Sequence, residues 1–157
     1  MSFLEPMSKE CFPSYIEYLI VQYAQENVDA GRWPKAGALT RSREDTEKQL
    51  PRGIETENNY FFEIKVPEIN ESVGWIWLSL ENSDITNTVF IYDLEIKAEY
   101  RRQGYAKLAL KEIEGFAATH KVANIGLHVF SQNEGARALY AEMGFQTVSL
   151  NMMKKVG

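Results

Sequence analysis

Residues 101–106, Arg-Arg-Gln-Gly-Tyr-Ala, combine the features of an anion-binding turn. They follow a run of strand-forming residues at 89–92 and come directly before a long helical pattern. The first N–H groups of a helix have no partners inside the helix, and the helix dipole adds partial positive charge there. Gly104 lets the main chain approach a phosphate because it has no Cβ, and Arg101 and Arg102 can donate charge-assisted hydrogen bonds. This stretch therefore predicts a phosphate site.

The turn differs from two well-known phosphate motifs. It lacks the Gly-Lys-Ser/Thr of a P-loop, and it has one glycine where a dinucleotide fingerprint has three. An arginine pair before a helix also occurs as an ordinary solvated turn. The assignment therefore depends on what surrounds the turn.

Two acids, Asp93 and Glu95, stand at the end of the strand that leads into the turn. Residues two apart in a regular strand point to one face, so Tyr92, Leu94 and Ile96 are expected on the other. A strand end that emerges into solvent would give the same pattern. A β-bulge in this strand would reverse the parity and change which side chains share a face.

Two signatures in this order resemble the GNAT superfamily of N-acetyltransferases. Residues 101–106 fit the pattern Arg/Gln-x-x-Gly-x-Gly/Ala after an acidic strand end. Downstream, residues 127–130 resemble the family's strand, residues 133–140 its Asn-x-x-Ala-x-x-Leu-Tyr helix, and residues 143–145 its Gly-Phe exit. Two signatures at a plausible spacing are more specific than either alone.

The chain departs from the family pattern at two positions. Ala98 stands where members often have proline, and Ala106 stands where glycine is commoner. Neither residue removes a backbone donor, so the expectation of cofactor binding is unchanged.

The resemblance implies that the chain binds acetyl-CoA as acyl donor. It assigns the phosphates to the anion-binding turn, whose cofactor residues are Arg101, Arg102, Gln103, Gly104, Tyr105 and Ala106. It assigns the pantetheine arm to the backbone of Leu94, Glu95 and Ile96, which would pair with it like an added strand. Asn133 and Tyr140 are implied as further cofactor contacts, although capping a helix would by itself explain Asn133.

The resemblance also implies catalytic roles for three residues. An acid at the strand end would accept the proton of the amine, with Glu95 preferred and Asp93 the alternative. Tyr140 would donate a proton to the departing thiolate, unless it is only a core aromatic residue.

The remaining reactive residue types are expected to be structural. We interpret His128, Trp75 and Trp77 as packing residues and Cys11 as an inert thiol. One cysteine and two histidines offer no metal-ligand pattern, so no metal is expected.

Composition limits the possible partners. The chain has 157 residues and 45% hydrophobic residues, which predicts one domain spanning 1–157. The net charge of −5 argues against nucleic acid or an anionic membrane as partner. No signal peptide or membrane span is predicted, so a cytoplasmic location is expected.

The order of elements predicts an α/β fold of the α+β type, with a central mixed, mostly antiparallel sheet flanked by helices. Expected strands cover residues 2–6, 60–66, 73–80, from 89, 125–130 and 145–155. Expected helices cover residues 13–30, from 105 and 134–143, and residues 40–50 form a loosely attached helix if they are helical at all, with Ser42 as a possible N-cap. Short links make the middle strands an antiparallel meander, and the helix after Gly104 makes a parallel crossover.

The sequence therefore predicts an acyl-CoA-dependent N-acetyltransferase that moves an acetyl group to a primary amine by direct attack in a ternary complex. The alternative is a GNAT-fold module that binds acyl-CoA as a sensor or interaction protein without transfer. The resemblance places the acceptor wall at residues 31–53, which carry no readable signature. The acceptor is thus either a small-molecule amine or a protein amino group, and an oligomer is possible.

Overall fold

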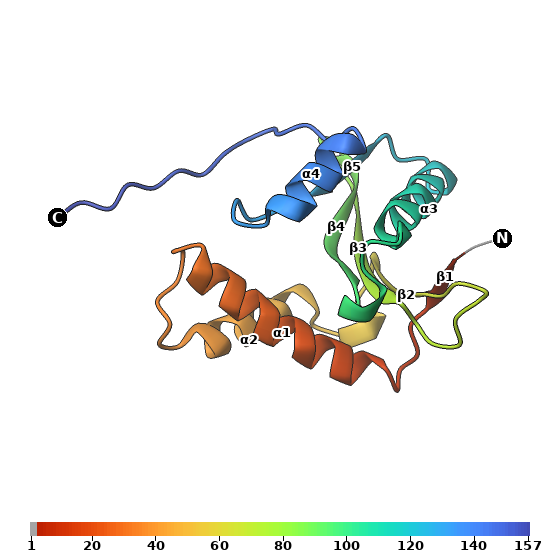
Figure 1. The fold of residues 1–157 in the computed structure, drawn as a ribbon, viewed down its shortest axis with the longest axis horizontal. Coiled ribbons are helices and arrows are strands. Elements are labelled where there is room, and N and C mark those ends of the chain that lie inside the picture. The colour runs from red at the N-terminus through yellow and green to blue at the C-terminus, as the bar shows by residue number, and fades with distance from the viewer. Residues whose placement is uncertain (1–2) are drawn as a thin grey trace.

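A central five-stranded sheet divides the molecule into two layers of helices. The computed structural model describes residues 3–157. The strands lie in the order β1-β2-β3-β4-β5, with α1 and α2 on one face and α3 and α4 on the other (Figure 1). Within residues 3–157, no helix combines the length and the apolar character that crossing a bilayer requires.

The sheet has the predicted mixed topology. β1 (Leu4–Pro6), β2 (Asn59–Ile64), β3 (Gly74–Asn82) and β4 (Asn87–Ile96) pair antiparallel in sequence order. β5 (Asn124–Leu127) pairs parallel with β4 after the crossover through α3. The meander and the crossover are therefore confirmed, while β5 is shorter than the expected 125–130.

The long first helix, α1 (Phe12–Asp29), matches the expected 13–30 within one residue at each end. Its apolar residues recur every three to four positions, so one face turns toward the sheet and buries Tyr15, Ile20 and Ala24. The helix ends at Ala30, and Gly31 follows with a φ of 74°. A glycine just after the last turn is the expected way to end a helix.

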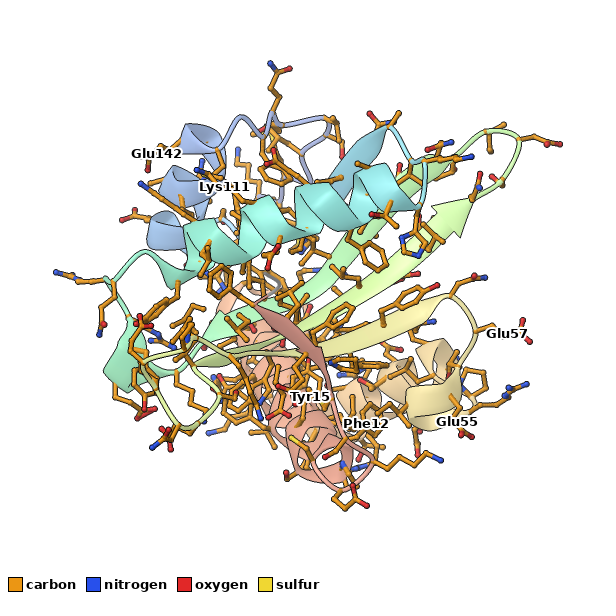
Figure 2. The ribbon with its side chains drawn as sticks, turned by 90° about the vertical axis from the view of Figure 1, so that its right-hand side faces the viewer. Phe12, Tyr15, Glu55, Glu57, Lys111 and Glu142 are labelled. Atoms are coloured by element: carbon orange, nitrogen blue, oxygen red, sulfur yellow. The ribbon has the colours of Figure 1, made fainter. Side chains whose placement is uncertain are left out.

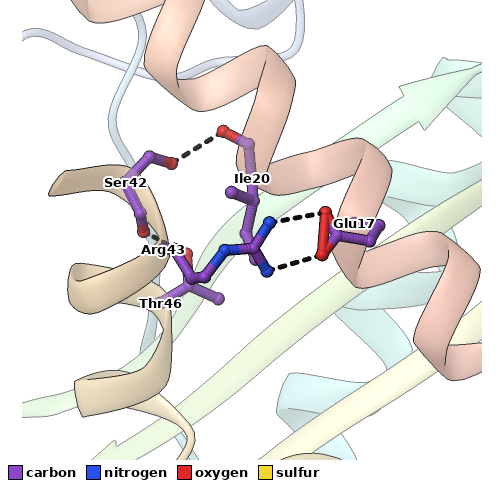
Figure 3. A network of polar contacts seen from close by, with 5 residues as sticks. All are labelled: Glu17, Ile20, Ser42, Arg43 and Thr46. Carbon is purple, nitrogen blue, oxygen red and sulfur yellow. Dashed lines mark hydrogen bonds and ion pairs between the residues drawn. The ribbon is translucent and has the colours of Figure 1, made fainter. Parts of the chain in front are cut away.

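The second helix, α2 (Ala38–Gln49), corrects one prediction. Ser42 is not its N-cap, because Gly37 occupies that position with a φ of 77°. The buried Ser42 hydroxyl instead donates to the carbonyl of Ile20 in α1, at 2.7 Å. Arg43 donates through both terminal nitrogens to the carboxylate of Glu17, so α2 is bound to α1 and does not lie loosely on the surface (Figure 3).

Each face of the sheet carries its own apolar core. The larger core lies beneath α3 (Tyr105–Thr119) and includes Ile76, Leu78, Val89 and Ile113. The smaller core lies under α1 and is aromatic; Figure 2 shows Phe12 and Tyr15 on this side of the sheet. It consists of Met7, Tyr15, Leu50, Phe61 and Trp77, with partly buried residues around them.

The expected last strand is absent. α4 (Glu134–Glu142) ends at Met143 and Gly144, as predicted within one residue, but residues 145–157 contain no strand. They run away from the body as an extended tail (Figure 1). The prediction was wrong because strand-forming residues make a strand only when their backbone pairs with another strand, and this tail pairs with none within residues 3–157.

Candidate active site

A β-bulge at Tyr92 controls which residues of β4 face α1. Trp77 of β3 pairs with Asp93, but its neighbour Leu78 pairs with Ile91, so Tyr92 is one extra residue in β4. The ring of Tyr92 stacks on that of Trp77 with 4.6 Å between centroids. Tyr92 therefore lies on the same face as Asp93, which corrects the prediction that it faces the other way.

Leu94 and Ile96 follow the predicted alternation. Both pack against the core beneath α3, while Glu95 points toward α1 with Asp93. The bulge thus leaves the predicted acidic pair on one face, beside an aromatic residue.

Two phenols of α1 hold the two carboxylates. The Tyr15 hydroxyl donates to Oδ2 of Asp93 at 2.7 Å, and the Tyr18 hydroxyl donates to Oε1 of Glu95 at 2.6 Å. The guanidinium of Arg101 lies 3.5 Å from the same oxygen of Glu95. Glu95 is therefore held by a phenol and a cation, whereas the structure gives Asp93 only a neutral donor.

Burial raises the pKa of Asp93 from 3.8 to about 7, and the nearby charges of Glu95 and Glu26 add to this rise. The hydrogen bond from Tyr15 opposes the shift but does not cancel it. The pKa of Glu26, on α1, is raised by its own burial and then by the charge of Glu95. Three carboxyl groups thus share one electrostatic environment between α1 and β4.

The β4 edge beyond the bulge is open. Within residues 3–157, β5 pairs with β4 only from Thr88 to Ile91, so residues 94–96 have a strand partner on the β3 side alone. The opposite edge of these residues could accept an added extended segment, as the sequence predicted.

Gly74 of β3 is required for the close packing at this end of β4. A Cβ placed there would lie 2.1 Å from the carbonyl oxygen of Glu95. The Nε of Arg101 donates to the carbonyl of Ile96 at 2.9 Å and so ties the following turn to the strand. The Arg101 side chain thus has partners within the protein. The backbone N–H groups of the turn remain as donors for an anion.

The turn between β4 and α3 has the backbone geometry of an anion-binding loop. Arg102 and Gly104 both have left-handed backbone angles, with φ of 63° and 84°. Such alternation turns successive N–H groups toward one point. Gly104 is the N-cap of α3, and no atom lies within 4 Å of the position a Cβ would take. Residues 101–104 are exposed. Tyr105 and Ala106, which begin α3 behind them, are half-buried.

The second predicted signature places two residues on α4. The Asn133 side chain caps the helix by accepting from the N–H of Ala136 at 3.3 Å. Tyr140 packs edge-on against Phe145, with ring centroids 5.5 Å apart. Burial raises the pKa of Tyr140 to about 12, and the charge of Asp93 contributes. The charge of Asp93 on β4 therefore reaches the phenol of Tyr140 on α4, which stays uncharged at neutral pH.

Sequence reasoning missed Tyr15, Tyr18 and Glu26 as site residues. Their spacing of three and eight residues places them along one side of α1, a signal that was readable in the sequence. What the sequence could not supply was the approach of α1 to the end of β4, because that contact joins residues 78 and 77 positions apart.

Two residues expected to be structural have structural surroundings. His128 packs edge-on against Phe130 at 4.8 Å. Burial raises the pKa of the Cys11 thiol, and the charge of Glu63 raises it further, which favours the unreactive thiol form.

Comparison with known proteins identifies the class. A profile of the Acetyltransferase (GNAT) family matches residues 18–145. The chain therefore belongs to this family and is an N-acetyltransferase, as the two sequence signatures predicted.

Particular relatives support this assignment. The chain is 38% identical to the uncharacterized N-acetyltransferase YycN of Bacillus subtilis over 98% of this chain and 97% of the relative. The crystal structure of YycN superposes with a TM-score of 0.92 over the same shares. The uncharacterized N-acetyltransferase YdgE of Bacillus subtilis is 30% identical over 98% of this chain and 97% of the relative.

A more distant structure shares the fold. The aminoglycoside acetyltransferase AAC(6')-Iy, crystallised with the bisubstrate analogue CoA-S-monomethyl-acetylneamine, is 13% identical. Its TM-score is 0.58 over 98% of this chain and 97% of that chain.

Asp93→Asn should stabilise the protein in a pH-dependent way. Because the folded pKa is about 7 and the unfolded value 3.8, the folded protein holds a proton that the unfolded chain loses between these values. The free energy of unfolding of the original protein should decrease as pH rises from about 4 to about 7. The variant should not show this decrease. We expect Asp93→Asn to gain on the order of 4 kcal/mol at pH 8 and almost nothing below pH 4, measured by urea unfolding.

Asp45→Asn, at an exposed position on α2, is the matched control and should shift stability little at either pH. A variant of Asp93 that unfolds at the same urea concentration as the original protein at pH 8 would contradict the raised pKa.

Proposed function

We propose that this protein transfers the acetyl group of acetyl-CoA to a cationic primary amine, with both substrates bound at once. The observation that carries the proposal is the pair of carboxyl groups, Asp93 and Glu95, that Tyr15 and Tyr18 hold beside the open edge of β4. An acidic face attracts an ammonium group, and an open strand edge suits an extended acyl carrier.

The residues around the open edge fit acetyl-CoA. The exposed N–H groups at Arg102–Ala106 and the start of α3 suit the phosphates, since the loop has room and the helix end carries partial positive charge. The backbone of residues 94–96 suits the amides of the pantetheine arm. When bound, the thioester supplies an acyl group that an amine can attack directly. The same fold in AAC(6')-Iy holds a molecule that joins CoA to an aminoglycoside.

The α1 face suits a cationic acceptor. Tyr18 and Glu26 line the helix opposite the acids of β4, and the charge of Glu95 is felt at Glu26. An ammonium group that enters here reduces the repulsion between the carboxylates. This reduction favours binding of the cationic acceptor.

Asp93 is the better candidate for the general base. A base works best when its pKa lies near the working pH, and the pKa of Asp93 is about 7. Glu95, which the sequence favoured, accepts from Tyr18 and pairs with Arg101, and this leaves it as an anchor for the ammonium group. Asp93 would take the amine proton either directly or through a water molecule.

Tyr140 suits the role of general acid. Its pKa of about 12 keeps the phenol protonated at neutral pH, and no hydrogen-bond partner for its hydroxyl is found within residues 3–157. A free phenol O–H can donate to a thiolate as it departs, whose ordinary pKa is about 8.5.

The non-catalytic alternative needs only the acetyl-CoA site. It requires neither a carboxyl group with a raised pKa nor a phenol that stays protonated, and the presence of both therefore favours transfer over binding alone.

Turnover with a panel of amines tests the proposed function. Release of free thiol from acetyl-CoA should accelerate with cationic primary amines, including polyamines, aminoglycosides and lysine peptides. Neutral or anionic amines of similar size should be poor acceptors, because the site carries excess negative charge. Turnover limited to neutral or anionic acceptors would contradict the cationic acceptor, and acetyl-CoA binding without any turnover would favour the sensor.

Gly104→Val should weaken acetyl-CoA binding at least tenfold, about 1.4 kcal/mol. The φ of 84° is strained for valine, and its side chain would cover the N–H groups that face the phosphates. Calorimetric titration measures the affinity.

Gly37→Val is the matched control, because Gly37 also has a left-handed φ, 77°, at a helix N-cap and lies on α2. Both variants should lose stability, but only Gly104→Val should lose affinity. Equal affinities for the two folded variants would remove the phosphate assignment.

Variants of the proton-transfer residues should separate the roles of acid, base and anchor. Tyr140→Phe should lower kcat by about 100-fold with little effect on acetyl-CoA affinity, since only a hydroxyl is lost. Asp93→Asn should lower kcat at pH 7 by about 100-fold, with a loss that shrinks as pH approaches the amine pKa near 10.4. Glu95→Gln should chiefly raise the KM of the amine.

Tyr60→Phe, in β2 against Phe116, is a control for removing a phenol elsewhere and should keep its activity. These measurements need conditions in which chemistry limits the rate. If Glu95→Gln shows the pH-dependent loss and Asp93→Asn does not, Glu95 is the base. An unchanged kcat for Tyr140→Phe would make Tyr140 a core residue.

A further inference from the structure

The loop between α1 and α2, together with the first turns of α2, forms a basic segment. Residues 30–43 contain no acidic residue, although the chain as a whole has a net charge of −5; their basic residues are Arg32, Lys35, Arg41 and Arg43. Arg43 pairs with Glu17 of α1 (Figure 3). Within residues 3–157, the other three basic residues make no ion pair, so this basic segment carries positive charge that the chain does not neutralise.

Arg41 is the residue of the basic segment whose surroundings are unusual. Arg41 is half-buried, and its guanidinium carbon lies 5.4 Å from the ring centroid of Trp33. Its Nη1 atom is buried and has no hydrogen-bond partner in the part of the chain that the structure describes. Nearly all buried polar groups in proteins have a partner, and a buried charged group without one costs free energy. These are the surroundings of a residue that binds an anion.

A carboxylate is the anion that fits Arg41. A guanidinium group is planar and offers parallel N–H donors to the two oxygens of a carboxylate. The Nη2 atom of Arg41 lies 3.8 Å from the position that a Cβ of Gly37 would take, so the glycine keeps a side chain away from this nitrogen. The first turn of α2 contains no acidic residue that could supply the carboxylate from within the chain. A bound molecule is therefore its source.

Two aromatic side chains, Tyr23 and Trp33, connect Arg41 to the candidate active site. Trp33 packs edge-on against Tyr23 of α1, with ring centroids 5.5 Å apart. Burial and nearby charges, that of Tyr23 among them, raise the pKa of Tyr92, so Tyr23 lies near Tyr92. Tyr92 directly precedes Asp93 in β4 and shares its face of the sheet. Arg41 and the acids of the site thus lie on the α1 side of the sheet, with the aromatic pair between them.

We propose that the acceptor carries a carboxylate in addition to its amine and that Arg41 binds this carboxylate. The acceptor is then a basic amino acid, such as lysine or ornithine, or a peptide that ends in one. Its side-chain ammonium lies at Asp93 and Glu95, and its carboxylate pairs with Arg41 beyond the aromatic pair. This inference rests on the proposed transfer to a cationic amine and narrows the class of acceptor.

Charge distinguishes such an acceptor from a polyamine. A diamine of the same length would place its second ammonium group against Arg41, where like charges repel. A basic amino acid meets the acids of β4 with its ammonium group and the basic segment with its carboxylate, so each charge lies beside an opposite one. Acids and a basic segment on one side of the sheet therefore favour basic amino acids over polyamines.

Acetylation of lysine and of lysinamide tests the inference, because lysinamide has a neutral amide in place of the carboxylate. An acidic site alone would favour lysinamide, which carries the higher positive charge. We expect kcat/KM to be about tenfold higher for lysine. Arg41→Gln should abolish this preference by raising the KM of lysine, and its turnover of lysinamide shows that the variant is folded. Alanyl-lysine and alanyl-lysinamide extend the comparison to a peptide end. Equal kcat/KM within both pairs of acceptors would overturn the proposal.

Arg43→Gln is the matched control. It removes the same charge from the same helix, two residues away, at an arginine that is already paired with Glu17. The preference for lysine over lysinamide should persist in this variant. An equal loss of the preference in both variants would mean that the overall charge of α2 is responsible, and this result overturns the role of Arg41.

Calorimetric titration of the CoA-saturated protein with lysine separates this inference from the proposed function. Arg41→Gln should weaken lysine binding about tenfold, and Arg43→Gln should not. If no amine is acetylated, the proposed transfer fails, yet this difference in affinity would still support the carboxylate site. Absence of lysine binding to the original protein, or the same affinity in the two variants, would refute the site.

Discussion

The extra residue in β4 is the constraint on which the candidate active site depends. Without the bulge at Tyr92, strict alternation would put Tyr92 and Asp93 on opposite faces of the sheet. With it, the Tyr92 ring seals the aromatic core under α1 by stacking on Trp77, while Asp93 still turns toward the same helix. One extra residue in β4 therefore allows Tyr92 to pack in the aromatic core while Asp93 still faces α1.

The electrostatic consequence is that the negative charge of Asp93 lowers the stability of the folded protein. Burial and neighbouring carboxylates raise the pKa of Asp93, so its charged form is destabilised in the folded protein. The phenols of Tyr15 and Tyr18 compensate in part by donating to the carboxylates. A raised carboxyl pKa of this kind is typical of sites that change protonation during a reaction. A carboxylate whose charge is fully stabilised by its neighbours would be a weak base.

The two open strand edges at β4 and β5 have different surroundings. The edge of β4 beyond the bulge has no partner on the β5 side, and we propose that it holds the extended acyl carrier. The outer edge of β5 lies beside an apolar groove. In both cases unpaired backbone groups attract an extended partner, and the side chains nearby select which one.

Local patterns in the sequence were enough to predict most of the fold. The apolar period of α1, the short links between β2, β3 and β4, and the glycine before α3 depend on neighbouring residues, and all three predictions hold. The two signatures around Gly104 and Tyr140 likewise predicted the family, because each is a continuous stretch whose chemistry is local.

What remained undecided depends on contacts between distant residues. The bulge at Tyr92 arises from the pairing of β3 with β4, and the phenols on the acids arise from the approach of α1 to β4. The same limit explains the error at residues 145–155, whose composition favours a strand although they pair with no strand within residues 3–157. Local residue order thus determines the elements and the class of chemistry. Packing between elements determines which carboxyl group has a raised pKa, because burial exists only once the chain has folded. It also determines which strand edges stay unpaired.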